Sequence, residues 1–193
     1  MRHRDLLAAI TDLEPTQVDG VFERHSALRW EELRASAAGG RWGERRAFEV
    51  LYLGRPRNSV VVEAYRHLVD DELDDAEGLA ATILERRIIT CRVAVPHVLD
   101  LRPRSVQAAI GLSETQLYSP VGDYLAPQAV AAAAHQLGLN GLIAPAATRL
   151  GDTLALFPTN LPLEHWPTVI ARDIWHGLPP DPRQLRAVGE DAS

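Results

Sequence analysis

The chain has 193 residues, of which 46% are hydrophobic and 24% are charged, and it carries a formal net charge of −6. This composition is typical of one globular domain with an apolar core, and the acidic balance argues against general nucleic-acid binding, which requires a basic face. No run of about 18 apolar residues predicts a membrane span, and the single cysteine excludes an internal disulfide and favours a reducing cytoplasm.

All 20 basic side chains other than histidine are arginine. Because lysine is absent, no lysine can form a Schiff base or act as a nucleophile. Any anion site in this protein must therefore use the planar, permanently charged guanidinium group.

In the first third of the chain, helical and strand patterns alternate. Residues 1–13 predict a short helix, and residues 22–35 are mixed and predict a strand followed by a helix. Residues 47–53 alternate as a strand does. The two faces of that strand are expected to carry Phe48, Val50 and Tyr52, and Leu51 and Leu53.

A loop at 54–59 then leads into a helix, which Asn58 or Ser59 is expected to cap. The apolar residues of this helix follow the spacing i, i+3, i+4, i+7, which predicts one buried stripe. The stripe consists of Val61, Ala64, Tyr65 and Leu68.

Strand patterns dominate the second half of the chain, around one clear helix. Residues 88–101 predict a strand that ends near Pro96. Residues 124–141 predict an alanine-rich helix with Pro127 at its start and Gly138 at its end.

Residues 142–160 predict a β-hairpin around a turn at 148–152, and residues 168–175 predict a last strand. This order of elements favours an α+β fold, with mixed or antiparallel sheets and flanking helices, over a regular parallel α/β sheet. We expect one domain over residues 1–176, followed by a loose tail over residues 177–193 that is rich in proline and charge.

Several familiar motifs are absent from the sequence. No spacing of cysteine and histidine matches a zinc site, so we expect no metal. The acidic run "DDELDDAEG" at 70–78 lacks the alternating oxygen ligands and central glycine of an EF-hand loop, and we interpret it as a solvated helix end. The stretch "GGRWG" at 39–43 precedes a strand, so it is neither a dinucleotide fingerprint nor a P-loop.

The segment from Gly39 to Glu63 is compatible with two interpretations. In the first, the glycine pair makes a turn, Trp42 fills the core and Arg41 is solvated. Glu63 then pairs with a basic side chain three or four positions further along the same helix.

In the second interpretation, the same segment binds and cleaves a charged nucleotide. The glycines let the backbone approach a ligand closely, and Arg41 presents a fork suited to phosphate. Tyr52 offers a flat face for stacking. Glu63 supplies the carboxylate that stabilises the oxocarbenium charge of N-glycosidic cleavage.

The order of these motifs resembles the RES-domain toxins of bacterial toxin–antitoxin pairs. The resemblance rests on "GGRW", "LYL" and the later glutamate, and it continues through "VPHVLDL", the alanine-rich helix and "GLIAPAATRLGDTLALFPTN", over about residues 20–170. It implies a fold related to ADP-ribosyltransferases and an activity that consumes NAD+ by hydrolysis or phosphorolysis. NAD+ is then the substrate, with inorganic phosphate as a candidate co-substrate, and no separate cofactor is expected.

The resemblance also implies the site residues. Arg41 and Arg24 would bind the pyrophosphate and ribose, Tyr52 would stack on nicotinamide, and Glu63 would stabilise the ribosyl cation. Arg29 is the rival candidate for Arg24. The implied catalytic residues are Glu63, Arg24 and Tyr52, and the implied NAD-binding residues are Arg41, Tyr52, Arg24, Gly40 and Trp42.

Two positions depart from the pattern of the family. The residues after the tryptophan, at 43–46, are Gly-Glu-Arg-Arg where the family often has Asn-Pro-Pro, which alters the rim of the expected pocket. The family's serine after the late proline falls on Ala146, so either that hydroxyl is dispensable or Thr148 substitutes for it.

The resemblance further implies a partner. This is a cognate small, helical, Xre-like antitoxin that occludes the active site and forms a hetero-oligomer with the toxin. We expect no direct nucleic-acid or membrane partner. Two other functions stay open: transfer of ADP-ribose to a protein, and a catalytically inactive protein that keeps only the antitoxin interface.

Overall fold

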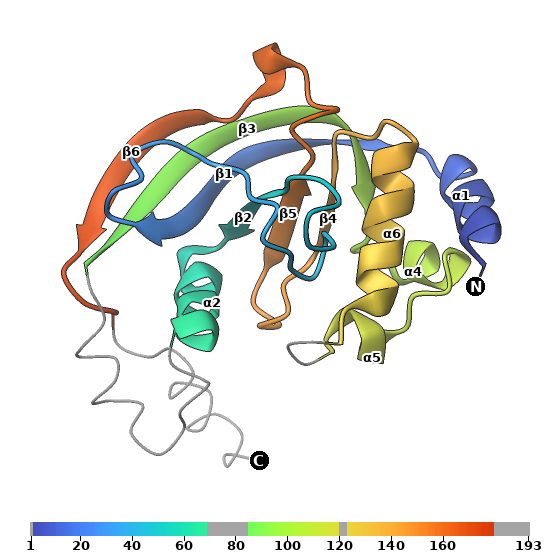
Figure 1. Ribbon diagram of the computed structural model, residues 1–193, viewed down its shortest axis with the longest axis horizontal. Coiled ribbons are helices and arrows are strands. Elements are labelled where there is room, and N and C mark those ends of the chain that lie inside the picture. Colours follow the sequence, from blue (N-terminus) through green and yellow to red (C-terminus); the bar gives the residue numbers. More distant parts are fainter. Residues whose placement is uncertain (1, 69–84, 120–122, 180–193) are drawn as a thin grey trace.

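The computed structural model describes residues 2–68, 85–119 and 123–179, and in it a strongly curved sheet is flanked by helices (Figure 1). The six strands are β1 (Thr16–Ala27), β2 (Leu51–Arg55), β3 (Arg86–Asp100), β4 (Gly141–Pro145), β5 (Asp152–Leu156) and β6 (Thr168–Trp175). The helices are α1 (His3–Thr11), α2 (Arg57–Leu68), α4 (Arg104–Ala109), α5 (Glu114–Leu117) and α6 (Leu125–Gln136), with a 3₁₀ turn η2 (Leu163–His165).

The paired strands form a closed ring that runs from β1 through β2, β5, β4 and β3 back to β1. The order is β1-β2-β5-β4-β3-β6, and β1 also pairs with β3 along most of its length. The contacts are antiparallel except for β3–β4, which is parallel. The long strands β1 and β3 arch over the short strands β2, β5 and β4 (Figure 1). This mixed arrangement confirms the α+β class expected from the order of elements.

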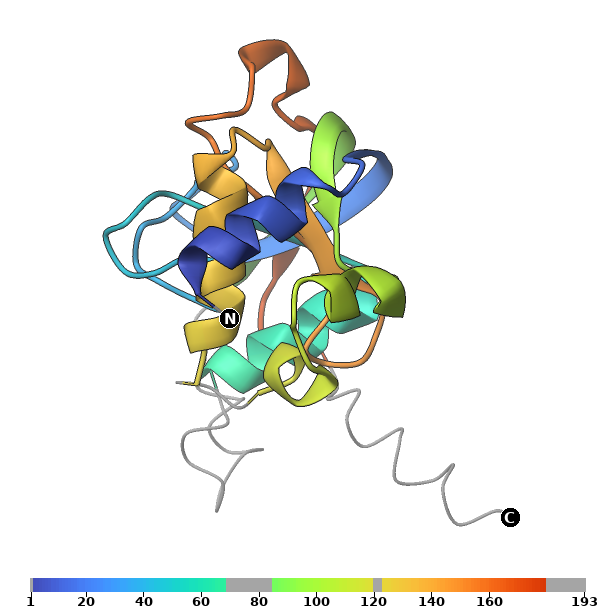
Figure 2. The same ribbon diagram turned by 90° about the vertical axis from the view of Figure 1, so that its right-hand side faces the viewer.

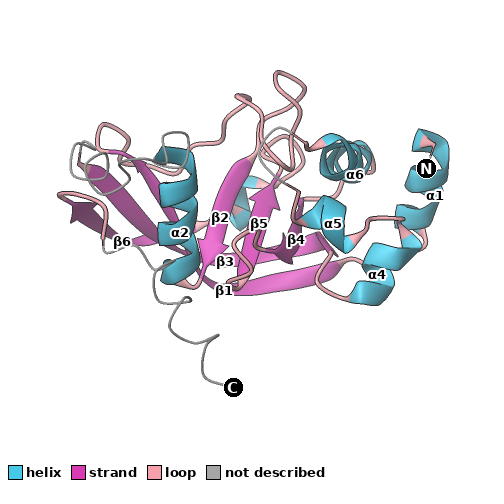
Figure 3. Ribbon diagram, turned by 90° about the horizontal axis from the view of Figure 1, so that it is seen from below, coloured by secondary structure: helices cyan, strands magenta, loops and turns pink. Residues whose placement is uncertain are grey.

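Helices occupy both ends of this sheet. Seen from below, α2 lies at one end and α4, α5 and α6 lie at the other, with β2, β5 and β4 between them (Figure 3). The N-terminal helix α1 lies across α6 (Figure 2).

The core of the protein consists mainly of two large clusters of buried apolar side chains. One joins α1 and α6 to the sheet and includes Trp42, Val50 and Phe157. The other lies between the long strands and the short strands and includes Phe22 and Leu51. Burial of each such large apolar side chain contributes about 1.5–3 kcal/mol.

The strand β2 lies between these clusters because its side chains alternate. Phe48, Val50 and Tyr52 pack on the first cluster. Leu51 and Leu53 pack on the second. This division of faces was predicted and is confirmed, although the regular strand covers only residues 51–55.

Other local predictions are also confirmed. Val61 and Tyr65 of the α2 stripe are buried, and the half-buried side chains of Leu68 and of Trp175 on β6 pack against them. The helices α1 and α6, the β4–β5 hairpin and the last strand lie where the pattern placed them. Gly138 follows α6 with φ of 76°, the left-handed conformation that glycine adopts at helix ends.

Three boundary predictions were wrong. The strand β1 begins at Thr16, and no helix forms over the rest of the 22–35 segment. The helix α2 already begins at Arg57, so Asn58 and Ser59 lie inside it and do not cap it. The strand β3 does not end near Pro96 but runs to Asp100.

Pro96 is tolerated because the ladder shifts register there. The β1–β3 pairing is irregular between Thr16 and Val18, opposite the segment from Val95 to Val98. A proline has no N–H to donate, so within a sheet it is confined to such irregularities or to edges. The short helices α4 and α5 had no periodicity long enough to predict them.

Two expectations lie outside the described residues. These are the solvated acidic run at 70–78 and the part of the loose tail from residue 180 onward. In the described part of the chain, no helix is long and apolar enough to cross a membrane.

Candidate active site

A cavity of about 760 Å³ opens between β1, β2, α2 and the loop 38–45, with the start of α6 on its opposite wall. Arg24, Arg41, Tyr52 and Glu63 all line it. The structure thus brings together four residues that lie on a strand, a loop, a second strand and a helix. Arg29 does not line the cavity.

The Gly-Gly-Arg-Trp segment forms a tight turn on the cavity wall. The backbone N–H of Gly40 donates to the carbonyl of Gly43 at 2.9 Å, and the reverse bond is 3.4 Å. The N–H of Trp42 donates to the Tyr52 hydroxyl at 3.0 Å. A Cβ added at Gly40 would meet that hydroxyl at 2.8 Å, and one added at Gly43 would meet Val50 at 2.7 Å. Both glycines are therefore required by the packing of the turn on β2.

Trp42 itself is part of the core. Its side chain is 1% exposed and packs in the cluster that joins the helices to the sheet. The tryptophan anchors the turn from below, and its backbone, not its ring, faces the Tyr52 hydroxyl.

Arg41 extends from this turn to the far wall. It donates from Nη1 to the Leu117 carbonyl at 3.0 Å and to Ser119 Oγ at 3.1 Å, and from Nη2 to the Ser119 carbonyl at 2.7 Å. Its guanidinium lies 4.7 Å from the centre of the Tyr124 ring. Arg41 is therefore not simply solvated: it ties the turn to the end of α5 and the start of α6, and it holds a fixed positive charge at the cavity.

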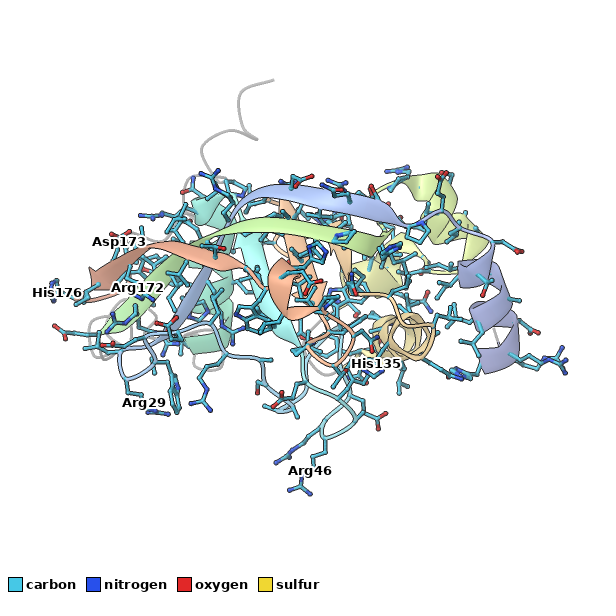
Figure 4. All side chains as sticks on the ribbon, turned by 90° about the horizontal axis from the view of Figure 1, so that it is seen from above. Arg29, Arg46, His135, Arg172, Asp173 and His176 are labelled. Carbon is cyan, nitrogen blue, oxygen red and sulfur yellow. The ribbon has the colours of Figure 1, made fainter. Side chains whose placement is uncertain are left out.

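Arg24 lies on β1 beside the same wall. It donates from Nη1 to the Tyr52 carbonyl at 3.2 Å. Burial lowers the pKa of this guanidinium from its ordinary value. Arg29, by contrast, is exposed, lies 5.0 Å from the centre of the Trp30 ring and points away from the sheet (Figure 4).

Burial raises the pKa of Tyr52 to about 12, against the opposing effect of the hydrogen bond from the Trp42 N–H. The hydroxyl is therefore protonated at neutral pH. Tyr52 can act as a wall or as a hydrogen-bonding group, but not as a general base.

Glu63 lies on α2, a helix held by two polar contacts at its start. Arg57 donates to Glu23 on β1 from Nε at 2.9 Å and from Nη2 at 2.6 Å. The hydroxyls of Ser59 and Thr148 are hydrogen-bonded, with their oxygens 3.0 Å apart. These contacts fix the first turn of α2, and through it the position of Glu63.

Ala146 stands at the position of the family's serine, and Thr148 is its candidate substitute. Ala146 is 1% exposed and Thr148 is 4% exposed, and neither lines the cavity. The Thr148 hydroxyl faces Ser59 at the start of α2. Thr148 therefore supports the helix of the site and does not present its hydroxyl to the cavity.

Several cavity residues had no motif to reveal them. Gln128 in the first turn of α6 donates from Nε2 to the Gly40 carbonyl at 3.0 Å, which closes the wall opposite Tyr52. The others come from β1, β3 and the start of α6. They are Glu23, His25, Arg86 and Tyr124. The alternation of β1 places His25 on the same face as Glu23, but only the β1–β3 pairing brings in Arg86.

At the rim, the loop contributes one arginine. Arg45 lines the cavity, whereas Arg46 extends from the loop away from the molecule (Figure 4). With Arg24 and Arg41, the walls hold several guanidinium groups and one helix carboxylate, Glu63. Such a site can hold an anionic ligand that carries a ring, with a carboxylate beside it.

Comparisons with known proteins are consistent with this geometry. The family model "RES domain" matches residues 18–190. A chain in the crystal structure of the M. tuberculosis MbcT–MbcA toxin–antitoxin complex has the same fold, with a TM-score of 0.78 and 24% identity over 95% of this chain and 97% of that chain. No match was found among curated protein sequences.

Proposed function

We propose that this chain, which belongs to the RES domain family, is the toxin of a toxin–antitoxin pair and consumes NAD+ by breaking the bond between nicotinamide and ribose. The observation that carries this proposal is the convergence of Arg24, Arg41, Tyr52 and Glu63 in one cavity of about 760 Å³. That volume is in the range of small-molecule and cofactor sites.

In the proposed mechanism, positive charge binds the substrate and negative charge acts on it. Arg24 and Arg41 face the pyrophosphate and the ribose next to it. Arg41 does so from a guanidinium already fixed by the Leu117 and Ser119 carbonyls, which favours a preorganised charge over a freely moving fork. The Tyr52 ring and the backbone of Gly40 and Trp42 form the wall against which nicotinamide stacks.

Glu63 then stabilises the positive charge that develops on the ribose as the N-glycosidic bond breaks. The bonding electrons leave with nicotinamide, which is neutral once released. No metal ion is needed for this step, because the pyridinium is already a good leaving group. The carboxylate acts most strongly in the transition state, where the charge on the ribose is greatest.

A small nucleophile completes the reaction. Capture by water gives ADP-ribose and a proton, and capture by inorganic phosphate gives ADP-ribose phosphorylated at the anomeric carbon. A covalent intermediate on a lysine or cysteine of this chain is disfavoured, because the chain has no lysine and burial raises the pKa of Cys91 to about 12. Arg45 at the rim favours phosphate, whose oxygens match a guanidinium fork.

The proposed partner is a small helical antitoxin that inserts a segment into this cavity and forms a hetero-oligomer with the toxin. Support comes from the fold shared with a chain of a toxin–antitoxin complex. Inhibition of NAD+ loss by a co-expressed antitoxin would test this part of the proposal separately from the chemistry.

The direct test is incubation of the purified protein with NAD+ in phosphate-free buffer, with and without added phosphate, followed by mass spectrometry of the products. We expect nicotinamide release that rises with phosphate, and a phosphorylated ADP-ribose. Plain ADP-ribose in both buffers would leave hydrolysis. A mass shift of one ADP-ribose on an added protein, with little free product, would replace both by the transferase. No loss of NAD+ would overturn the proposal.

Glu63→Gln sharpens the test, since it keeps the shape and removes the charge. Turnover should fall by about 100-fold or more, the scale for one preorganised electrostatic partner, while NAD+ affinity changes little. The matched control is Glu49→Gln, because Glu49 is exposed and outside the cavity. Unchanged turnover in a folded Glu63→Gln protein would remove Glu63 from the mechanism.

The choice between the two early arginines has its own test. Arg24→Met should weaken NAD+ binding by about tenfold, the scale of one hydrogen bond to a charged group, and Arg29→Met should leave it unchanged. Titration calorimetry with NAD+ compares the two variants. Equal dissociation constants would contradict the assignment of Arg24.

A further inference from the structure

The cavity has two ends, which the β1 pairings define. At one end, β1 meets β2 through the pair Glu23–Gly54, two residues beyond Tyr52. Further along β1, its pairing with β3 ends at Ala27–Arg86. The Arg86 side chain reaches back along β1 from that pair: its Nη2 donates to His25 Nδ1 at 3.2 Å, and His25 lies two residues from Glu23, which is roughly 7 Å at about 3.3 Å per residue. We call the second region, lined by His25, Ala27, Trp30 and Arg86, the Arg86 end.

Arg86 carries a charge at this end that no described carboxylate neutralises. Its Nη2 donates to His25 Nδ1 at 3.2 Å, and His25 accepts as a neutral group. Among the described residues, Arg86 has no ion pair, and its buried Nε has no hydrogen-bond partner. Burial lowers its pKa, and the charge of Arg29 adds to that effect.

The neighbouring arginine differs in its charge partner, although its Nε is likewise buried without a hydrogen-bond partner among the described residues. Arg87, the next residue on β3, lies outside the cavity and forms an ion pair with Glu31 at 3.4 Å, in addition to a hydrogen bond to the Leu28 carbonyl. A half-buried guanidinium without a carboxylate partner is unfavourable unless an anion neutralises it. The cavity beside Arg86 is the space from which such an anion can approach.

We propose that Arg86 binds the adenylate phosphate of NAD+, so that the Arg86 end selects the dinucleotide over nicotinamide mononucleotide. This inference rests on the proposed function, in which nicotinamide stacks at the Tyr52 end of the same cavity. Arg24 and Arg41 are assigned to the phosphate beside the nicotinamide ribose, so the Arg86 guanidinium is left for a second phosphate. A mononucleotide has no second phosphate, whereas the dinucleotide carries its adenylate phosphate to Arg86.

In this assignment, the arginines of the cavity bind different phosphates of the dinucleotide. Arg24 and Arg41 lie at the Tyr52 end, where the first bonds the Tyr52 carbonyl and the second follows Gly40. They contact the phosphate that both nicotinamide mononucleotide and NAD+ possess. Arg86 contacts the phosphate that only NAD+ and AMP possess. Loss of Arg86 therefore has a signature that loss of Arg24 does not.

The test measures dissociation constants of NAD+, nicotinamide mononucleotide and AMP by titration calorimetry, for the wild-type protein and for Arg86→Met. We expect NAD+ and AMP to bind about tenfold more weakly or worse to the variant, the scale of one hydrogen bond to a charged group. Nicotinamide mononucleotide should bind within about twofold of wild type, since RT ln 2 is below the worth of any such bond. The matched control is Arg92→Met, an exposed arginine on the same strand.

Each outcome decides the inference. Unchanged NAD+ affinity in Arg86→Met, or an equal loss for nicotinamide mononucleotide and NAD+, would overturn it, as would absence of NAD+ and AMP binding to the wild-type protein. If wild-type protein binds both and Arg86→Met weakens both, but NAD+ is never cleaved, the adenylate subsite stands and the proposed reaction fails. Thermal unfolding of each variant separates loss of binding from loss of fold.

Discussion

Replacing Arg57 with methionine tests whether one ion pair positions the helix that carries Glu63. Arg57 donates to Glu23 from two nitrogens at 2.9 and 2.6 Å, and it also reaches Asp173 on β6 at 3.1 Å. The Glu23 carboxylate is nearly buried, and within the described part of the chain the hydrogen bond that remains to it without Arg57 is that from the Thr90 hydroxyl at 3.1 Å. The variant therefore leaves a charge close to the protein interior without its counterion.

The expected loss of stability lies between the losses that are typical of buried and of exposed ion pairs. Removal of one partner from a buried pair costs about 3–5 kcal/mol, and an exposed pair contributes about 0–1 kcal/mol. The side chain of Glu23 is 11% exposed, but that of Arg57 is 48% exposed and is screened by solvent. We therefore expect Arg57→Met to lower the free energy of unfolding by about 2 kcal/mol, which lowers Tm by about 4–8 °C for a chain of this size.

Thermal unfolding measures this loss, and NAD+ turnover reports whether α2 has moved. Turnover should fall in Arg57→Met although Arg57 is outside the cavity lining, because Glu63 lies on the same helix. In the double variant Glu23→Gln/Arg57→Met the nearly buried carboxylate is gone and only the half-exposed Asp173 loses its partner, so part of the stability should return. The control Arg104→Met removes an arginine that is 89% exposed. A Tm equal to wild type, or a double variant less stable than the single one, would refute the reasoning.

Two further predictions concern stability. Gly40→Ala should lower the free energy of unfolding by about 1–3 kcal/mol, the scale of overpacking, because the new Cβ would lie 2.8 Å from the Tyr52 hydroxyl. Chemical denaturation measures this loss. If Gly40→Ala costs as much in a Tyr52→Phe background as in the wild-type protein, the clash with the hydroxyl is contradicted. Burial alone would raise the pKa of Asp100, but hydrogen bonds from Arg102 outweigh it and hold that pKa below its ordinary value. Since a depressed pKa contributes stability that is present above the unfolded pKa and is lost as pH falls through the folded pKa, Asp100→Asn should flatten the decline of Tm below about pH 4, and an unchanged acid slope would exclude this contribution.

Local sequence patterns were sufficient to predict those structural features that depend on a single helix or strand. The two faces of β2 follow from the alternation of Val50, Leu51, Tyr52 and Leu53, since each face packs on its own apolar cluster. The stripe of α2 and the glycine after α6 were equally readable. Each depends on the spacing of neighbouring residues and not on which distant strand lies beside them.

Element ends were less predictable, because pairing across the sheet decides them. The strand β1 begins six residues before Phe22, at Thr16, because the β1–β3 ladder continues to Thr16 opposite Val98. Pro96 looked like a strand end, but a register shift in the same ladder accommodates it. A reading of one segment at a time cannot detect a partner strand about 70 positions away, which is the usual limit of local reasoning.

The residues of the cavity also divide into those that the local sequence suggests and those that only strand pairing and helix packing bring in. Arg41, Tyr52 and Glu63 lie close enough in the sequence for their spacing to suggest a site, and the structure brings them together in one cavity. Arg86 and Gln128 come from segments that carry no recognisable motif. They reach the cavity only through the β1–β3 pairing and the packing of α6 over the loop 38–45.

The turn at Gly40 joins the folding requirement to the proposed chemistry. Gly40 and Gly43 have no side chains because the Tyr52 hydroxyl and Val50 occupy the space that a Cβ would need. The same packing holds Arg41 at the angle from which it reaches the Ser119 carbonyl. The departure from the family pattern at 43–46 begins inside this turn, at the buried Gly43, and continues through exposed residues at 44–46. Gly43 fits the turn because Val50 occupies the space of a Cβ, so the turn that faces Tyr52 still forms. The exposed residues alter the mouth of the cavity, through Arg45, and so bear on which small nucleophile enters in the proposed reaction.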